Sequence, residues 1–383
     1  MLFDDEEFDP YDDEEIATST ETPERLNDPH QSTLMVGHST IEQKLISLIN
    51  KDAMPHAIIF SGHKGIGKST MAFRLARALL ARGIHDPNQD SLFGDAAPQS
   101  DLETLEIQSD HPAFSKVASR GHPDLLTVQL PVDAKTQKIK KEINVETARK
   151  VAPFLRMTSG EGGWRIVIID DADLMNRNAQ NAILKILEEP PKNALLILVC
   201  HRLGAMIPTI RSRCRVLDFD SLSHDDFNLL LAKEYGHNFT NDEKQILLKF
   251  SNQSAGQAKD IIDQKGLDVI KSTLELIGQF PNISEVETYA LAESAGRAGQ
   301  DYAFTMVEKT FLLGLEEIIS SQVKGHGLSE PFVSTGFENI KRDYDLQKLL
   351  KLHEELKEHL AQAKYASLDK RLVILNAFNA LKR

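Results

Sequence analysis

The chain has 383 residues, of which 41 % are hydrophobic and 26 % charged, and its formal net charge is −13. This length predicts two or three domains. The longest apolar run, 194–200, is far shorter than the roughly 20 residues that cross a bilayer. The acidic N-terminus lacks the basic and apolar regions of a secretory signal. Two cysteines exclude a disulfide scaffold and a four-thiolate zinc site. We therefore expect a cytoplasmic protein with no membrane partner.

The negative charge is concentrated at the N-terminus. Residues 1–24 hold eleven acidic side chains and no Lys or Arg, and subtracting these eleven from the total of 57 leaves 46 acids against 44 bases. Such a segment buries too little apolar surface to offset its ordering entropy, so residues 1–30 are predicted to be a disordered tail. A docking peptide that uses Phe3, Phe8 and Tyr11 is the alternative. The rest of the chain is nearly neutral.

The first half of the chain alternates helical and strand patterns. Apolar residues at helical spacing predict a helix over 39–49, and a buried strand over 57–60 precedes a helix over 68–82. Residues 86–119 are rich in Asp, Pro, Gln and Ser and are predicted to be a surface excursion. Further strands are predicted at 125–130, 165–170, 195–200 and 216–219, with helices at 144–157 and 177–188. This alternation predicts an α/β domain with a parallel sheet covered on both faces.

Strand signals stop after residue 221. A small helical block follows, to about residue 265, and helical patterns continue at 302–315, 346–360 and 372–381. The second half is therefore predicted to be all helical.

A glycine-rich turn between the first strand and the next helix fits the pattern G-x-x-x-x-G-K-[ST]. Its residues are Gly62, His63, Lys64, Gly65, Ile66, Gly67, Lys68 and Ser69, followed by Thr70. The glycines let successive backbone N–H groups converge on a phosphate, and the helix that follows adds its dipole. Lys68 would contact the β- and γ-phosphates, and Ser69 would ligate Mg²⁺. The loop thus predicts binding of ATP or ADP with Mg²⁺, and a retained loop without a ligand is the alternative.

Two carboxylates end the strand at 165–170. Asp170 is the candidate acid on the metal side, and Asp171 would polarise a water molecule. Ligands of parallel α/β sheets bind at this carboxyl edge. A helix cap or a turn is the alternative for this pair, and the P-loop upstream favours the functional interpretation.

Three motifs together resemble the clamp-loader subunits of bacterial DNA polymerase III. They are the acidic stretch at 170–173, the stretch Asn-Ala-Ile-Leu-Lys-Ile-Leu-Glu-Glu-Pro-Pro at 181–191, and Pro-Thr-Ile-Arg-Ser-Arg-Cys at 208–214. Their order and spacing cover about 36–219, and the Leu-Asp-Lys-Arg at 368–371 is similar to the last helix of the family's collar. The resemblance implies a RecA-like P-loop AAA+ domain at 31–220, a helical lid at 221–266 and a helical oligomerisation collar at 267–383.

The chain departs from the motor subunits of that family at several positions. In these departures it resembles the family's delta-prime branch, which has fewer catalytic residues. Residues 84–122 contain no cysteine, so the motor's zinc module is absent and no zinc is expected. Asp171 stands where the motors carry the longer Glu, and Cys200 and His201 replace the hydroxyl residues expected after the next strand. In the lid, Lys259 keeps a charge but lacks the planar fork of an arginine. The P-loop is intact.

The resemblance gives Arg213 its role. In this family the arginine of Ser-Arg-Cys reaches across a subunit interface into a neighbour's ATP site. Such an arginine finger accelerates nucleotide hydrolysis by roughly 10³- to 10⁵-fold. Without the resemblance, Arg211, Arg213 and Arg215 would be interpreted as a solvated basic edge.

The implied protein is a stator in a hetero-pentamer with gamma or tau motor subunits and a delta subunit, which loads the sliding clamp onto primer–template DNA. One alternative is a catalytically active AAA+ motor ATPase, either a gamma- or tau-like subunit or a DNA-remodelling ATPase. The other is an inert scaffold without nucleotide.

Overall fold

A five-stranded parallel sheet organises the first half of the molecule. In the computed structural model of the chain, the described residues are 28–82, 101–132, 139–161, 163–236, 239–365 and 368–382. The strand order is β2-β3-β4-β1-β5, and every paired neighbour is parallel. The strands are β1 (Ala57–Ser61), β2 (Leu125–Val128), β3 (Arg165–Ile169), β4 (Ala194–Cys200) and β5 (Arg215–Asp218).

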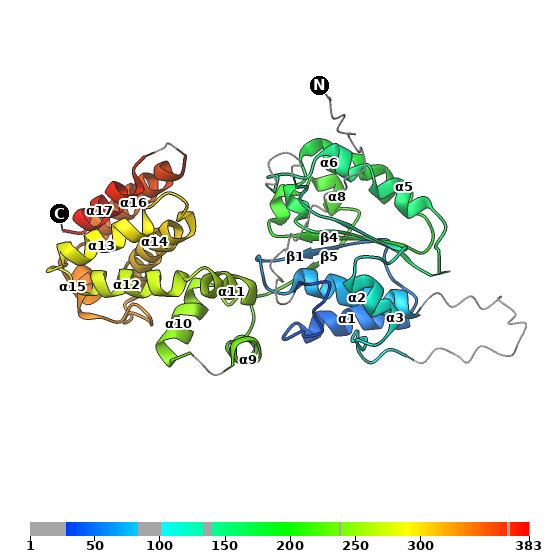
Figure 1. The fold of residues 1–383 in the computed structure, drawn as a ribbon, viewed down its shortest axis with the longest axis horizontal. Coiled ribbons are helices and arrows are strands. Elements are labelled where there is room, and N and C mark those ends of the chain that lie inside the picture. The colour runs from blue at the N-terminus through cyan, green and yellow to red at the C-terminus, as the bar shows by residue number, and fades with distance from the viewer. Residues whose placement is uncertain are drawn as a thin grey trace, which may run out of the picture.

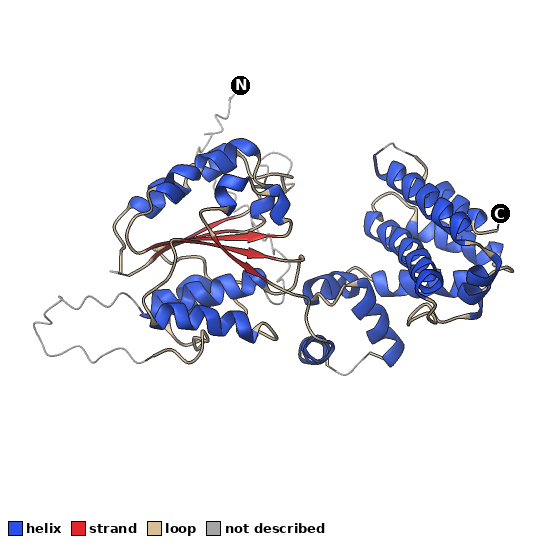
Figure 2. Ribbon diagram, turned by 180° about the vertical axis from the view of Figure 1, so that it is seen from behind, coloured by secondary structure: helices blue, strands red, loops and turns tan. Residues whose placement is uncertain are grey.

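Helices cover both faces of this sheet (Figures 1 and 2). One face packs on α1 (Ser39–Asn50), α2 (Lys68–Arg82) and α3 (Pro112–Ala118). The other packs on α4 (Val145–Ala148), α5 (Val151–Arg156), α6 (Arg177–Ala182), α7 (Leu184–Glu188) and α8 (Pro208–Arg211). Every residue of β1, β3 and β4 is buried, as continuous apolar runs predict for a sheet between two helical layers. The predicted α/β class with a parallel sheet is confirmed.

The predicted surface excursion at 86–119 is wrong over the part that the structure describes, from residue 101 onward. Leu105 and Val117 are fully buried in the core beneath α1 and α2. Pro112 stands at the first helical position of α3, and the side chain of His111 accepts the hydrogen bond of the Ala113 N–H. Polar composition concealed this small helix because only one of its faces is apolar.

Two helices predicted as single elements are each divided. The 144–157 segment forms α4 and α5, because Pro153 has no N–H to donate to the carbonyl of Arg149. The 177–188 segment forms α6 and α7, and at Ile183 the N–H bonds Gln180 O, three residues back. Short 3₁₀ helices follow β3 (Ala172–Leu174) and β4 (Leu203–Ala205).

The second half is all helical, as predicted. Three helices follow the sheet: α9 (His224–Tyr235), α10 (Asn241–Phe250) and α11 (Ala255–Asp263). Six more complete the chain: α12 (Gly266–Gly278), α13 (Glu285–Ala295), α14 (Asp301–Lys324), α15 (Thr335–Asp343), α16 (Leu346–Tyr365) and α17 (Lys370–Ala380). Buried residues from Leu222 to Leu381 form one continuous core, so these helices pack on one another across the predicted boundary at 266. The division into lid and collar stays a prediction.

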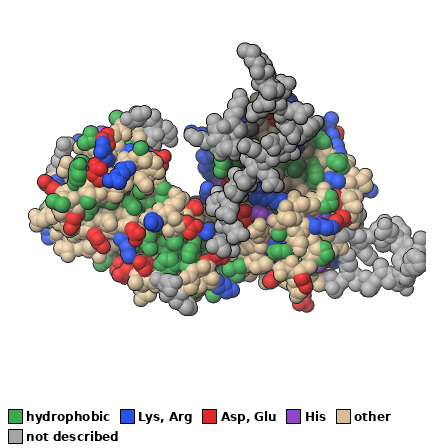
Figure 3. Space-filling model, in the orientation of Figure 1, with side chains coloured by type: hydrophobic (Ala, Val, Ile, Leu, Met, Phe, Trp, Pro, Cys, Tyr) green, Lys and Arg blue, Asp and Glu red, His purple; other side chains and the backbone are tan. Residues whose placement is uncertain are grey.

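The surface of these helices mixes both charges. Acidic and basic side chains are interspersed over the C-terminal helices on the face in Figure 3. This agrees with the near neutrality of the chain beyond residue 24.

Residues 1–27 of the predicted tail, 1–30, lie outside the described residues. Its last residues are folded: His30 is buried, and Arg77 donates hydrogen bonds to His30 O and Ser32 O. Arg74 likewise donates to Thr33 O at 2.9 Å. The prediction of a disordered segment is therefore wrong for residues 28–30, because His30 is buried and its carbonyl is bound by Arg77, a buried arginine of α2.

Candidate functional site

The glycine-rich loop follows β1 at the carboxyl edge of the sheet and leads directly into α2. Gly62, Gly65 and Gly67 all have positive φ, between 79° and 145°. Side chains are disfavoured in that region, so the sharp bends of the loop require glycine. His63 and Lys64 are exposed, Ile66 is buried, and Thr70 lies in the first turn of α2. The predicted phosphate loop therefore has the strand–loop–helix setting that its motif requires.

The ammonium of Lys68 lies inside the loop. Its Nζ donates a hydrogen bond to Gly62 O at 2.7 Å and another to His63 O, and the residue is 2 % exposed. Burial lowers the pKa of Lys68 to about 8, because it penalises the charged form, while the negative charge of Asp170 opposes that effect. A cation held in this way is placed to meet a phosphate.

Ser69, in the first turn of α2, lies in contact with Asp170, which follows β3. Ser69 Oγ donates a hydrogen bond to Asp170 Oδ1 at 2.8 Å. Burial raises the pKa of Asp170, and the hydrogen bond from Ser69 opposes that rise. A nearby cation would favour the ionised carboxylate.

Asp171 has a different partner. Its Oδ1 lies 2.6 Å from Nε2 of His201, which follows β4, the strand next to β3. The hydrogen bond from His201 lowers the pKa of Asp171. The main-chain N–H of His201 donates to Asp173 Oδ1 at 2.9 Å, so the position of His201 is fixed by a buried carboxylate.

The start of α11 docks on the phosphate loop. Ser254, the N-cap residue of α11, donates its hydroxyl to Lys64 O at 2.7 Å. The N–H of Gly256 donates to Gly65 O at 2.9 Å. The two glycines touch through their backbones: a Cβ at Gly256 would lie 2.7 Å from Gly65 Cα. This contact joins the phosphate loop to the helical half of the chain.

Replacing Gly256 by alanine should separate α11 from the loop and destabilise the chain by about 1–3 kcal/mol, the usual cost of forcing a methyl group into a packed contact. Hydrogen exchange of loop peptides should accelerate, and unfolding followed by the fluorescence of Trp164 should shift to lower denaturant. Gly204→Ala is the matched control, because a Cβ there meets nothing within 4 Å. Equal behaviour of the two variants would contradict the docking role.

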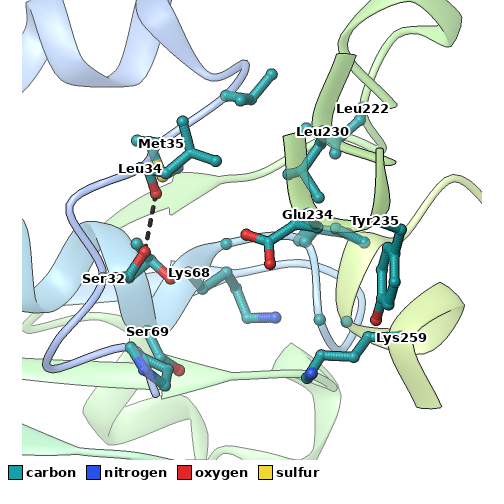
Figure 4. Close-up of a pocket in the computed structure, with 18 of the residues that line it drawn as sticks. Ser32, Leu34, Met35, Lys68, Ser69, Leu222, Leu230, Glu234, Tyr235 and Lys259 are labelled. Atoms are coloured by element: carbon teal, nitrogen blue, oxygen red, sulfur yellow. Dashed lines mark hydrogen bonds between the residues drawn. The ribbon is translucent and has the colours of Figure 1, made fainter. Parts of the chain in front are cut away.

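A cavity of about 200 Å³ opens between the loop and the helices that follow the sheet. Lys68, Ser69, Thr70 and His201 contribute to its lining from the sheet side. In Figure 4, Lys68 points into the cavity from the phosphate loop. Glu234 and Tyr235 of α9 and Lys259 of α11 lie across the cavity from it. Lys259 also forms an ion pair with Asp263 at 3.1 Å. Apolar side chains close the remaining walls: Leu34, Met35, Val36, Leu222 and Leu230.

Arg213 lies away from this cavity. It stands two residues before β5, whose Arg215 pairs with Ile58, whereas the phosphate loop begins beyond Ser61 at the other end of β1. The two features are thus at opposite edges of the sheet. Arg213 is held by Glu188 Oε1 at 3.0 Å and Thr209 O at 3.1 Å, and its side chain is 37 % exposed. It cannot reach a nucleotide at this chain's own loop.

Three contacts of the site were not predicted. His38 Nε2 lies 2.7 Å from Ile66 O, His201 pairs with Asp171, and Ser254 binds Lys64 O. The serine before an amphipathic helix was a detectable N-cap signal, but its second role depends on a partner 190 residues away. No local sequence pattern marks the two histidines.

Residues 37–223 match the model of the family described as DNA polymerase III, delta subunit. This part of the chain is therefore similar to the members of that family. The stretch contains the phosphate loop, the Asp170–Asp171 pair and Arg213, so the predicted resemblance to delta-prime clamp-loader subunits is confirmed.

The chain is also similar to several individual proteins. The chain is 32 % identical over 159 residues to the DNA polymerase III subunit delta′ of Pseudomonas aeruginosa, an overlap of 42 % of this chain and 41 % of the relative. It is 32 % identical over 178 residues to subunit delta′ of Bacillus subtilis, covering 46 % of each. The replication factor C small subunit of Methanocella arvoryzae is 26 % identical over 333 residues, 79 % of this chain and 86 % of that protein. A gamma subunit-related protein of Thermotoga maritima superposes with a TM-score of 0.44 at 17 % identity, covering 89 % of this chain and 98 % of that one.

The chain spans less than half the length of the two delta-prime relatives. Across the described ranges, no helix combines the length and hydropathy of a membrane span.

Proposed function

We propose that the chain is a delta-prime-like subunit of a DNA polymerase III clamp loader and acts there as a stator. The observation that carries this proposal is the position of Arg213: it is exposed, pre-oriented by Glu188, and at the sheet edge opposite the phosphate loop. A guanidinium placed there lies at the other sheet edge from this chain's own loop and would be available to a neighbour's site. In the assembly it would neutralise the charge that develops on a phosphoryl group during ATP hydrolysis by a gamma or tau motor subunit.

The cavity supports binding of ATP or ADP by this chain. Successive N–H groups of the loop and the ammonium of Lys68 suit phosphates, and the apolar wall formed by Met35, Leu222 and Leu230 suits a base.

The residues beside the loop also fit Mg²⁺. Ser69 Oγ and Asp170 Oδ1 are 2.8 Å apart and are hard oxygen ligands, which this ion prefers. Among the described residues, no group of three or more His, Cys, Asp or Glu side chains could hold a metal ion. Ser69 and Asp170 would therefore share the ion with phosphate oxygens. Bound there, Mg²⁺ would neutralise phosphate charge.

One observation favours the alternative of an active motor ATPase. The contact between Ser69 and Asp170, the proposed metal-side pair, supports this alternative, although Asp171 is bonded to His201. The two functions differ in where turnover occurs. A stator retains nucleotide, whereas a motor hydrolyses it at its own loop.

Lys68→Ala separates them. The variant should bind ATP about 10- to 100-fold more weakly than the wild-type full chain, because a charged hydrogen-bond donor is lost. Titration with a fluorescent ATP analogue measures this, and Lys51→Ala, at an exposed lysine just after α1, is the matched control. An assembly reconstituted with motor subunits, a delta subunit, clamp and primed DNA should keep ATP turnover within about twofold when it contains Lys68→Ala. Collapse of turnover in that assembly would support the motor function and overturn the stator.

A further inference from the structure

The two adjacent carboxylates at the end of β3 are bound to different partners. Asp170 accepts a hydrogen bond from Ser69 of the phosphate loop, whereas Asp171 is bonded to His201 from the neighbouring strand end. Asp171 also has a left-handed backbone, with φ of 54° and ψ of 43°. This conformation is uncommon outside glycine and marks a residue that its surroundings hold in place.

The histidine is fixed independently of Asp171. Its backbone N–H donates to Asp173 Oδ1 at 2.9 Å, and the other oxygen of Asp173 binds Arg202 Nε at 3.2 Å. Asp173 is itself buried. The backbone that carries the imidazole is therefore held in place by Asp173. If the Asp171 carboxylate moved toward the cavity, His201 would not move with it and their hydrogen bond would break.

His201 and the loop residues Lys68 and Ser69 line the same cavity. Hydrolysis there would require a water oxygen to bond to the γ-phosphorus while the bond from that phosphorus to the bridging oxygen breaks. The water proton would pass to a carboxylate and then to solvent. Asp171 is the carboxylate that the sequence assigns to this task, and its Oδ1 is 2.6 Å from His201 Nε2. The bond to His201 occupies an acceptor position of Oδ1 and holds the carboxylate toward the end of β4, so a water molecule would have to compete with the imidazole for it.

We propose that His201 is a positioning residue that holds the Asp171 carboxylate away from the attacking water and thereby keeps the bound nucleotide from rapid hydrolysis. This inference rests on the proposed nucleotide binding. It supplies a physical reason for slow turnover at an otherwise intact loop, beyond the shorter reach of Asp compared with Glu.

The test uses the full chain in excess over radiolabelled ATP, so that one turnover is observed, and a fluorescent ATP analogue for affinity. His201→Ala should raise the single-turnover rate about 10-fold while the dissociation constant stays within about threefold, because the bond acts on the chemical step. His201→Gln, which can still donate to Asp171, should return the rate toward wild type. Adding Asp171→Asn to His201→Ala should abolish the gain. His224→Ala, at an exposed histidine that begins α9 and lies outside the cavity lining, is the matched control.

The outcomes are distinct. A His201→Ala rate at or below wild type, with affinity retained, overturns the positioning role and leaves the proposed nucleotide binding intact. A gain that survives in the double variant also overturns it, because the released group would then not be Asp171. Failure of the wild-type chain to bind the analogue overturns both proposals. Thermal unfolding of each variant identifies any loss of folding, and if His201→Ala does not fold, the comparison of His201→Gln with His201→Asn decides, since asparagine is too short to span the bond.

Discussion

Arg213→Ala should remove hydrolysis at the neighbouring site of a reconstituted clamp-loader assembly, with a loss of roughly 10³-fold or more at that site. The side chain is exposed, and its partners Glu188 and Thr209 O lie on the chain's own surface, so the substitution should leave the fold unchanged. A pre-steady-state phosphate burst, recorded by rapid quench on clamp and primed DNA, should lose the amplitude of one site. Loading of the clamp should slow in parallel.

Two matched variants make this result specific. Arg211→Ala removes an exposed arginine two residues away and should leave the burst unchanged. Arg213→Lys keeps the charge but not the planar fork, so it should restore only part of the amplitude. An unchanged burst in Arg213→Ala would show that the arginine belongs to a solvated basic edge and would remove the main support for the stator.

Glu317→Ala should destabilise the helical half by about 2–4 kcal/mol. Glu317 lies on α14, is nearly buried, and accepts hydrogen bonds from Lys249 Nζ at 3.0 Å and from the Ser329 N–H and hydroxyl at 2.9 and 2.6 Å. Removing the carboxylate leaves three donors without this partner. Breaking a buried charge pair costs about 3–5 kcal/mol of unfolding free energy. We expect a smaller loss here because the Lys249 side chain is about one-third exposed. Urea unfolding followed by circular dichroism measures the difference.

The effect should depend on pH. Although burial opposes ionisation of Glu317, the hydrogen bonds from Ser329 and Lys249 hold its pKa below the ordinary value. A carboxyl whose pKa is lower in the folded state than in the unfolded state stabilises the fold at any pH above the unfolded-state pKa. That stabilisation is lost as the pH falls through the folded-state pKa. The gap between wild type and Glu317→Ala should therefore be full at neutral pH and shrink below about pH 4.5. Glu316→Ala, at an exposed neighbour on the same helix, should change stability by less than about 1 kcal/mol. An equal loss in both variants would contradict the role of Glu317.

The elements with strong local patterns could be predicted from the sequence. Continuous apolar runs identified the strands, and the phosphate loop was recognisable because its glycines and Lys68 stand at fixed spacing after a strand. The contact between Ser69 and Asp170 could be anticipated, although 101 residues separate them, because parallel strands end at one edge of the sheet.

The remaining features depend on tertiary contacts that no local pattern encodes. The α3 helix has seven residues and a polar outer face, so its buried Phe114 and Val117 were lost among polar neighbours. The pairing of His201 with Asp171 requires β4 to lie beside β3, and strand order is not readable from the strands themselves. The docking of Gly256 on Gly65 depends on the path of the chain through α9 and α10, which separate β5 from α11.

The placement of Arg213 and the phosphate loop at opposite edges of one sheet gives the chain a polarity. Any contact that delivers Arg213 to a neighbour's loop uses one side of the molecule and leaves the chain's own loop facing the other way. Such a contact has no two-fold axis, since the two surfaces that meet are different, and it joins subunits head to tail. A row built in this way has two unlike ends. A subunit at one end would offer an arginine without receiving one, so any nucleotide at its own loop would lack an arginine from a neighbour.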